Sequence, residues 1–237
     1  MADAAVVPGD RVLEVGAGFG SLTIALAAAG AEVLAVEFDR ALLEALREIV
    51  GPLPSVRVEP GDAMRMDWAG LLPGERWKMV SNLPYNIAVP LVAGMLEGVP
   101  AIDQFLVMVQ REVGERLAAG PGDDAYGAVS VRVAYRAEAA VVRRVPASVF
   151  WPRPKVDSVL VRIMRRHGPP VPADPERLFQ VVEAGFAERR KTMRNALRRL
   201  GLSVREADEA LERCGIAPNA RAEELSLQDF STLSETV

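Results

Sequence analysis

One short segment of the chain combines an amide, a proline and an aromatic ring in a way that suits a flat, amine-bearing ligand. It is Ser81-Asn82-Leu83-Pro84-Tyr85-Asn86-Ile87, which follows an apolar run typical of a buried strand. Asn82 offers an acceptor oxygen, and Tyr85 offers a ring face for stacking. Pro84 fixes the backbone so that the carbonyls of Leu83 and Pro84 can point at the same place. The same residues could instead form an ordinary strand-to-helix turn.

A glycine loop occurs earlier in the chain, between a β-rich run at 11–15 and an apolar helix. Its glycines are Gly16, Gly18 and Gly20. Such a loop lets the backbone approach a ligand and presents helix N–H groups to it. The dinucleotide fingerprint G-x-G-x-x-G requires a third glycine where Ser21 stands. The spacing therefore disfavours a nicotinamide cofactor and suits a ligand without a pyrophosphate.

Two acidic residues end the next two predicted strands. Glu37 follows 32–36 and could accept hydrogen bonds from ribose hydroxyls, whereas Asp62 follows 56–58 and could accept from an adenine amine. Each acid alone could be a solvated loop carboxylate. The carboxyl ends of parallel strands meet at one edge of a sheet, where ligands bind. Four such features on four successive strand ends therefore predict one ligand site.

The pattern of elements predicts an α/β protein with a second, helical domain. Strands are expected at 11–15, 32–36, 56–58, 77–80 and 102–109, and helices at 41–50 and 89–96. Their alternation is typical of a parallel sheet. A later pair of strands is expected at 139–145 and 156–163. Beyond a Pro/Gly-rich boundary, helices are expected at 175–186, 191–200, 204–213 and 227–233. We therefore predict domains at 1–166 and 174–237.

The composition excludes several other classes of protein. Cys214 and His167 are the only residues of their types, so a Cys/His zinc site has almost no ligands and no internal disulfide can form. We expect no membrane span and no signal peptide, and therefore a cytoplasmic protein. The net charge of −4 argues against a uniformly basic surface. A local basic segment at 186–199 could still bind RNA phosphates, or it could be a solvated face.

Taken together, these motifs resemble those of a known enzyme family. The series Glu14-Val-Gly-Ala-Gly-Phe-Gly20, Glu37, Gly61-Asp62-Ala63 and Asn82-Leu-Pro-Tyr85 resembles a class I S-adenosylmethionine-dependent methyltransferase. The Asn-x-Pro-[Tyr/Phe] motif marks members that methylate exocyclic amines of nucleobases. Further segments narrow the resemblance to the small-subunit ribosomal RNA adenine N6,N6-dimethyltransferases. They are Gln110–Val113 with Arg116-Leu117, Tyr126-Gly127 with Ser130-Val131, Phe150-x-Pro152-x-Pro154-Lys-Val-Asp-Ser158, and Arg189–Leu197.

This resemblance implies a fold, a reaction and a partner. The fold is a Rossmann-like sheet, mostly parallel with a late antiparallel strand, followed by a small all-α domain. The reaction transfers methyl groups from S-adenosylmethionine to N6 of two adjacent adenosines near the 3′ end of small-subunit rRNA. It yields N6,N6-dimethyladenosine and S-adenosylhomocysteine, without a metal, during ribosome biogenesis. The implied partner is an immature 30S particle, and the enzyme is expected to be a monomer away from membranes.

The residues and the resemblance together assign three groups of site residues. The catalytic group is Asn82, Leu83, Pro84, Tyr85 and Phe150. The donor-binding group is Glu14, Gly16, Gly18, Glu37, Phe38, Asp62, Ala63 and Asn82. The RNA-binding group is Arg153, Lys155, Arg189, Arg190, Lys191 and Arg194.

Two alternatives remain from the sequence alone. One is a large-subunit rRNA adenine methyltransferase of the macrolide-resistance type, against which Leu83 and the block at 189–197 argue. The other is a non-catalytic ribosome-assembly factor that keeps the pocket without turnover. The family usually begins with a further stretch whose Gln-Asn-Phe-Leu loop closes over the methyl donor, and we expect the first domain of this chain to lack it.

Overall fold

The computed structural model describes residues 2–74, 76–188 and 190–237. Over these residues the chain divides into two compact units. The first contains the residues up to Leu117 together with Ala137–Arg165, and the second contains Ala118–Arg136 with Arg166–Val237. This division differs from the predicted domains, because the segment 118–136 joins the C-terminal helices rather than the sheet.

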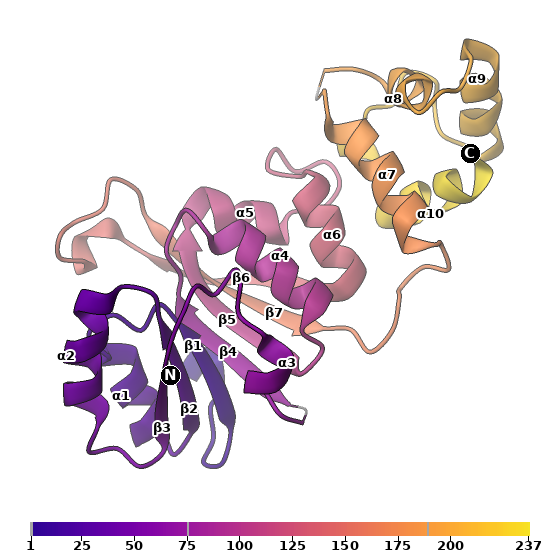
Figure 1. Ribbon diagram of the computed structural model, residues 1–237. Coiled ribbons are helices and arrows are strands. Elements are labelled where there is room, and N and C mark those ends of the chain that lie inside the picture. Colours follow the sequence, from indigo (N-terminus) through magenta and orange to yellow (C-terminus); the bar gives the residue numbers. More distant parts are fainter. Residues whose placement is uncertain (1, 75, 189) are drawn as a thin grey trace. The chain divides into compact units, whose positions relative to one another are not determined.

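A mixed sheet forms the centre of the first unit (Figure 1). Its strands are β1 (Arg11–Val15), β2 (Glu32–Glu37), β3 (Val56–Pro60), β4 (Trp77–Asn82), β5 (Ile102–Gln110), β6 (Ala137–Val145) and β7 (Ser158–Arg165). In the described part of the chain, their order is β3-β2-β1-β4-β5-β7-β6. Strands β1 to β5 run parallel, and β7 runs antiparallel to both β5 and β6. The prediction of a mostly parallel sheet with a late antiparallel strand is confirmed.

Helices cover both faces of this sheet. Helices α1 (Ser21–Ala28) and α2 (Arg40–Val50) pack on the face that carries Val12, Val33 and Ala35. Helices α3 (Trp68–Leu71), α4 (Ala88–Gly98) and α5 (Arg111–Ala118) lie on the opposite side (Figure 1). At Gly114 of α5, an added Cβ atom would lie 2.2 Å from Cγ2 of Val159 in β7, so helix and strand are in direct contact. The sheet is thus held rigidly between two helical layers, which fixes where its strands end.

Arg165, at the end of β7, holds the C-terminal end of α4. Its Nε donates a hydrogen bond of 2.7 Å to the carbonyl of Ile102. Its Nη atoms donate to the carbonyls of Met95, Leu96 and Val99 at 2.7–3.1 Å. The last carbonyls of a helix have no partner within the helix, so this guanidinium satisfies them. Helix α4 follows the 81–87 segment directly, and its anchoring therefore helps to position that segment.

The second unit is a helical bundle with its own core. Its helices are α6 (Ala128–Arg136), α7 (Pro175–Phe186), α8 (Met193–Arg199), α9 (Val204–Arg213) and α10 (Leu227–Thr236). Tyr126 and Val131 are buried in this core beside Leu211 and Phe230. Helix α8 begins two residues later than predicted, because Thr192 is extended. None of the helices in the described residues is both long and apolar enough to cross a membrane.

Candidate active site

The strand order places the ends of β1, β2, β3 and β4 along one edge of the sheet. The glycine loop and the 81–87 segment meet there. A Cβ atom added to Gly16 would lie 3.3 Å from Cδ of Pro84 and 3.8 Å from the carbonyl oxygen of Asn82. Gly16 also has a φ of +75°, which side-chain-bearing residues rarely adopt. Only glycine therefore fits at this junction, and the predicted donor-binding and catalytic segments are in contact.

Hydrogen bonds to Glu37 connect the ends of β1, β2 and β3. Its carboxylate is buried, and Oε2 accepts a 2.8 Å hydrogen bond from the N–H of Gly18. Its Oε1 accepts from the N–H groups of Phe38 and Asp39, both at 2.9 Å, and its carbonyl accepts from Gly61 at 3.0 Å. Each carboxylate oxygen can accept more than one hydrogen bond. Glu37 can therefore hold the glycine loop in place and still receive a hydroxyl from a ligand.

Phe38, Asp62 and Ala63 border the same edge. The ring of Phe38 is 74% exposed, although it directly follows a buried strand. Oδ1 of Asp62 accepts a 2.9 Å hydrogen bond from Met64 N–H, and Oδ2 lies 3.6 Å from Nε of Arg65. Ala63 is buried behind this turn. The edge thus offers an open aromatic face and an ordered carboxylate.

Glu14 lies deeper, beneath the glycine loop. It is 2% exposed, and Thr23 Oγ1 donates a 2.6 Å hydrogen bond to its Oε2. This bond joins the end of β1 to the first turn of α1, so Glu14 positions the loop between them. Burial raises the pKa of Glu14 from 4.5 to about 7, the hydrogen bond from Thr23 lowers it, and the charge of Glu37 raises it. The sequence contains no signal for Thr23, which looks like one more β-branched residue of an apolar helix.

We expect Glu14→Gln to weaken the pH dependence of stability. The pKa of Glu14 is about 7 in the folded protein and 4.5 without the fold, so ionisation opposes folding as the pH rises between these values. Glu14 alone should then lower the free energy of unfolding of the wild type by about 1–3 kcal/mol from pH 5 to pH 8. Urea unfolding at each pH measures this slope. Exposed Glu44 in α2 provides the matched control, since Glu44→Gln should keep the wild-type slope. An equal slope in the Glu14 variant contradicts the assignment.

Beside the glycine loop, the predicted catalytic residues gather around one cavity of about 340 Å³. Its described lining consists of Asn82, Leu83, Pro84, Tyr85, Phe150, Trp151, Pro152 and Pro154. The N–H of Leu83 donates to the carbonyl of Met108 at 3.1 Å, and the N–H of Ile87 donates to the carbonyl of Pro84 at 3.2 Å. These bonds fix the turn, so the backbone that carries Asn82 and the carbonyl of Leu83 has a defined position.

Two serines support this cavity. Oη of Tyr85 lies 3.3 Å from Oγ of Ser158, which is buried at the start of β7. Oγ of Ser81 accepts a 2.9 Å hydrogen bond from the N–H of Val15, which joins β4 to β1. Neither serine was predicted as a site residue. Two features of the sequence could have identified them. Ser158 is the last residue of the Phe150–Ser158 motif, and Ser81 is a polar residue at the end of a buried strand.

The predicted RNA-binding residues fall into separate groups. Arg153 and Lys155 are exposed in the loop that carries Phe150, between the short helix η2 (Ala147–Val149) and β7. In the second unit, Arg190 and Lys191 are exposed, whereas Arg194 forms an ion pair with Asp208 of α9. Arg189 lies outside the described residues. Asp208 thus neutralises part of the charge of Arg194, so Arg194 is less suited to binding an RNA phosphate than Arg190 and Lys191 are.

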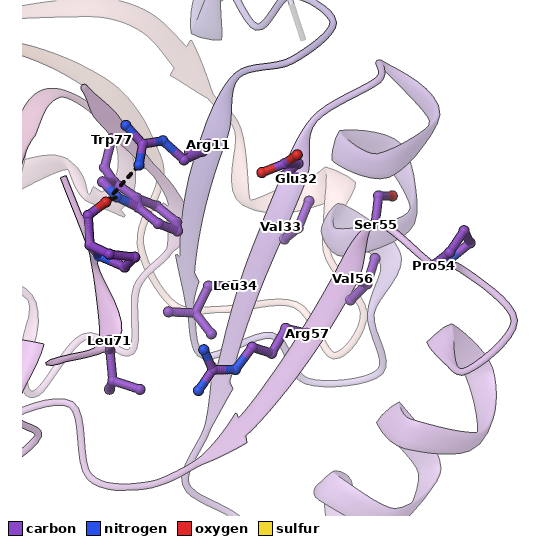
Figure 2. Close-up of a pocket in the computed structure, with 11 residues that line it drawn as sticks. Arg11, Glu32, Val33, Leu34, Pro54, Ser55, Val56, Arg57, Leu71 and Trp77 are labelled. Atoms are coloured by element: carbon purple, nitrogen blue, oxygen red, sulfur yellow. Dashed lines mark hydrogen bonds between the residues drawn. The ribbon is translucent and has the colours of Figure 1, made fainter. Parts of the chain in front are cut away.

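A second cavity, of about 660 Å³, lies at the opposite edge of the sheet (Figure 2). It is lined by residues from the amino ends of β1 to β4, including Arg11, Glu32 and Trp77. Nη1 of Arg11 donates to the carbonyl of Pro73 at 2.6 Å, and its guanidinium lies 5.4 Å from the centre of the Trp77 ring. Ligands of open α/β sheets bind at the carboxyl ends of the strands. This cavity is therefore not the candidate active site.

The chain is similar to known proteins over almost its whole length. Residues 1–237 match a family model described as ribosomal RNA adenine dimethylase. The chain is 42% identical over 244 residues to Ribosomal RNA small subunit methyltransferase A of Moorella thermoacetica, covering 99% of this chain and 85% of that protein.

Two solved structures have a similar fold. One is a dimethyladenosine transferase from Plasmodium falciparum, with a TM-score of 0.79 and 23% identity, covering 97% of this chain and 90% of that one. The other is the 23S rRNA methyltransferase ErmE, with a TM-score of 0.76 and 27% identity, covering 99% and 93%. The chain therefore belongs to the ribosomal RNA adenine dimethylase family of S-adenosylmethionine-dependent methyltransferases.

Proposed function

We propose that this enzyme dimethylates N6 of two adjacent adenosines near the 3′ end of small-subunit rRNA. It would do so as a cytoplasmic monomer acting on an immature 30S particle. The observation that carries this proposal is the cavity at the end of β4, where an amide, fixed carbonyls and two aromatic rings surround a space beside the glycine loop. The 42% identity to a small-subunit enzyme, against 27% to ErmE, favours the small-subunit target.

The residues at the sheet edge fit S-adenosylmethionine. Its positive sulfonium supplies an activated methyl group that a nitrogen nucleophile can accept directly. Gly16 leaves open the space that a Cβ atom would fill against Pro84. Glu37 would accept hydrogen bonds from ribose hydroxyls, Phe38 would contact the adenine ring, and Asp62 would accept from the adenine amine. Glu14 would contribute to donor binding indirectly, because it positions the glycine loop.

Asn82 and Leu83 would activate the target amine. The exocyclic amine of adenine is a poor nucleophile because its lone pair is delocalised into the ring. In the first methyl transfer, Oδ1 of Asn82 and the carbonyl of Leu83 would accept the two N–H groups, and in the second one of them would accept the N–H that remains. These hydrogen bonds would localise the lone pair and stabilise the developing positive charge. The carbonyl of Pro84 already accepts from Ile87, so Leu83 is the better second acceptor.

Tyr85 and Phe150 would hold the adenine after it leaves its stack. Enzymes that modify a base in a folded nucleic acid must extrude it into a pocket. Both rings line the cavity, and Ser158 lies within hydrogen-bonding distance of the hydroxyl of Tyr85. Stacking on an aromatic side chain is worth about 1–3 kcal/mol per base. The two rings would offset much of the loss of stacking in the RNA.

We expect the double reversal Arg190→Glu with Lys191→Glu to reduce the salt dependence of RNA binding. Both side chains are exposed, and each phosphate contact that is lost lowers the slope of log K against log salt by about 1. The slope should therefore fall by about 2, as measured by filter binding to rRNA at several salt concentrations.

The matched control for this charge reversal lies in the same unit. Arg205 and Arg213 of α9 are also exposed, and reversing both changes the net charge by the same amount. That control should keep the wild-type slope. If both double variants change the slope equally, the effect is one of net charge and not of a site at 190–191.

A labelling experiment tests the proposed function. The enzyme is incubated with methyl-labelled S-adenosylmethionine and either immature 30S or 50S particles, and the labelled nucleotides are mapped. Label on adjacent adenosines of 30S rRNA, present as N6,N6-dimethyladenosine, is the expected result. Label on 50S particles alone would instead support the large-subunit alternative. No label on either particle would leave a non-catalytic assembly role.

A further inference from the structure

Trp151 stands at the mouth of the proposed adenine cavity. Among the described residues it is the most exposed large apolar side chain, at 97%, and it lines the cavity next to Phe150. The next residues that line this cavity on the same loop are Pro152 and Pro154. An indole has a large apolar face, and here almost all of it is in contact with solvent.

The loop that carries Trp151 is anchored at its base. Oδ1 of Asp157 accepts a 2.9 Å hydrogen bond from the N–H of Ala147, and its carbonyl accepts a 3.0 Å hydrogen bond from the N–H of Arg111. The two prolines further restrict the backbone between these points. The indole is therefore presented on a stiff loop, which lowers the entropy lost when a partner covers it.

The chemistry of this loop suits a nucleic acid strand. Arg153 and Lys155 alternate with the prolines and are both exposed. The acid of this loop, Asp157, is engaged in hydrogen bonds to the backbone at the base. Cationic side chains interleaved with an aromatic ring are the pattern by which proteins bind single strands, with phosphates held by the cations and bases stacked on the ring.

Extrusion of the target base also affects the bases on either side of it in the RNA. When an adenine leaves its stack, the faces of the neighbouring bases lose their partner. A ring at the mouth of the cavity can cover one of these faces while the extruded base lies between Tyr85 and Phe150. We propose that Trp151 stacks on the nucleotide next to the target adenosine and so keeps the RNA strand open. This inference rests on the proposed function, because it requires that the cavity receives an adenine of RNA.

The test combines fluorescence with kinetics. Trp77 is buried and Trp68 is half-buried, so an oligonucleotide that stacks on the protein should quench mainly Trp151. We expect the hexanucleotide rA6 to quench the wild-type protein, and an abasic ribose-phosphate oligomer of equal length to quench much less. Trp151→Phe should lose the quenching. Equal quenching by both oligomers, or quenching that persists in Trp151→Phe, overturns the proposal.

Kinetics on 30S particles distinguish stacking from a structural role. We expect Trp151→Ala to raise the KM for the particles about 5- to 100-fold, with a smaller effect on kcat, because about 1–3 kcal/mol of stacking is lost. Trp151→Phe should restore most of the affinity. Val149, 63% exposed on the adjacent turn, provides the control, and Val149→Ala should leave KM unchanged. Because Trp151 is so exposed, thermal unfolding of both Trp151 variants should match that of the wild type.

Wild-type methylation of 30S particles is measured in the same assay. If the wild type transfers no methyl groups, the proposed function fails, whatever Trp151 does. If the wild type is active and Trp151→Ala keeps the wild-type KM, only the role of Trp151 is refuted.

Discussion

Replacing Asn82 with alanine is expected to lower the rate of methyl transfer about 100- to 1,000-fold, the effect of removing one preorganised polar group from a transition state. Asn82 pairs with Met108 of β5 at the end of β4, so its backbone is fixed and the substitution removes only the side-chain amide. Donor binding should weaken much less, because Glu37 and the glycine loop remain. Single-turnover transfer to 30S particles measures the first effect, and calorimetry with S-adenosylmethionine measures the second.

A second asparagine in the same segment provides the control. Asn86 is exposed in the turn before α4 and is not among the described residues that line the cavity. Asn86→Ala should therefore keep wild-type turnover. Asn82→Asp retains an acceptor oxygen and should fall between the alanine variant and the wild type. Turnover of Asn82→Ala at the wild-type rate would refute the role of the amide in activating the amine.

Replacing Gly114 with alanine is expected to lower the free energy of unfolding by about 2–3 kcal/mol, at the upper end of the usual range for overpacking. The added methyl group would lie 2.2 Å from Cγ2 of Val159 and 2.9 Å from Cγ2 of Val161. Valine side chains are stiff and cannot turn away without strain. Helix α5 would have to move off the sheet. Urea unfolding of the purified variant measures the loss.

A glycine of another helix separates packing from helix propensity. An added Cβ atom at Gly94, on the exposed side of α4, would meet nothing within 4 Å. Gly94→Ala should therefore raise stability by about 0.5–1 kcal/mol, because alanine favours the helix. If Gly114→Ala is as stable as the wild type, α5 does not lie against β7 as closely as the separation of 2.2 Å requires.

The sequence predicts the sheet edge well because each strand there ends in residues of distinct chemistry. The predicted limits of β1, 11–15, agree with the structure, and β5 extends one residue beyond the predicted 102–109, to Gln110. The prediction for β4 stops at Val80, whereas the strand continues to Asn82. The reason is that Ser81 and Asn82 still pair with Val107 and Met108 of β5. Because the side chains of Ser81 and Asn82 are polar, apolar periodicity cannot predict this pairing.

Other features depend on contacts between distant residues. Periodicity cannot show that Glu14 is buried, because its partner Thr23 lies on the following helix. The contact between Tyr85 and Ser158 spans 73 positions. The predicted domain boundary places Tyr126 and Val131 with the sheet. Their partners, such as Phe230, are about a hundred residues away and are known only once the chain has folded.

Over the described residues, the polypeptide passes between the two units three times, after Leu117, Arg136 and Arg165. Neither unit is thus encoded by an uninterrupted piece of the gene. During synthesis, Tyr126 leaves the ribosome well before the carbonyl of Leu225 that its hydroxyl contacts at 3.0 Å. The helical bundle can therefore complete itself only after Leu225 has been synthesised. A single recombination junction could not exchange it for another domain, so both units are expected to be inherited together.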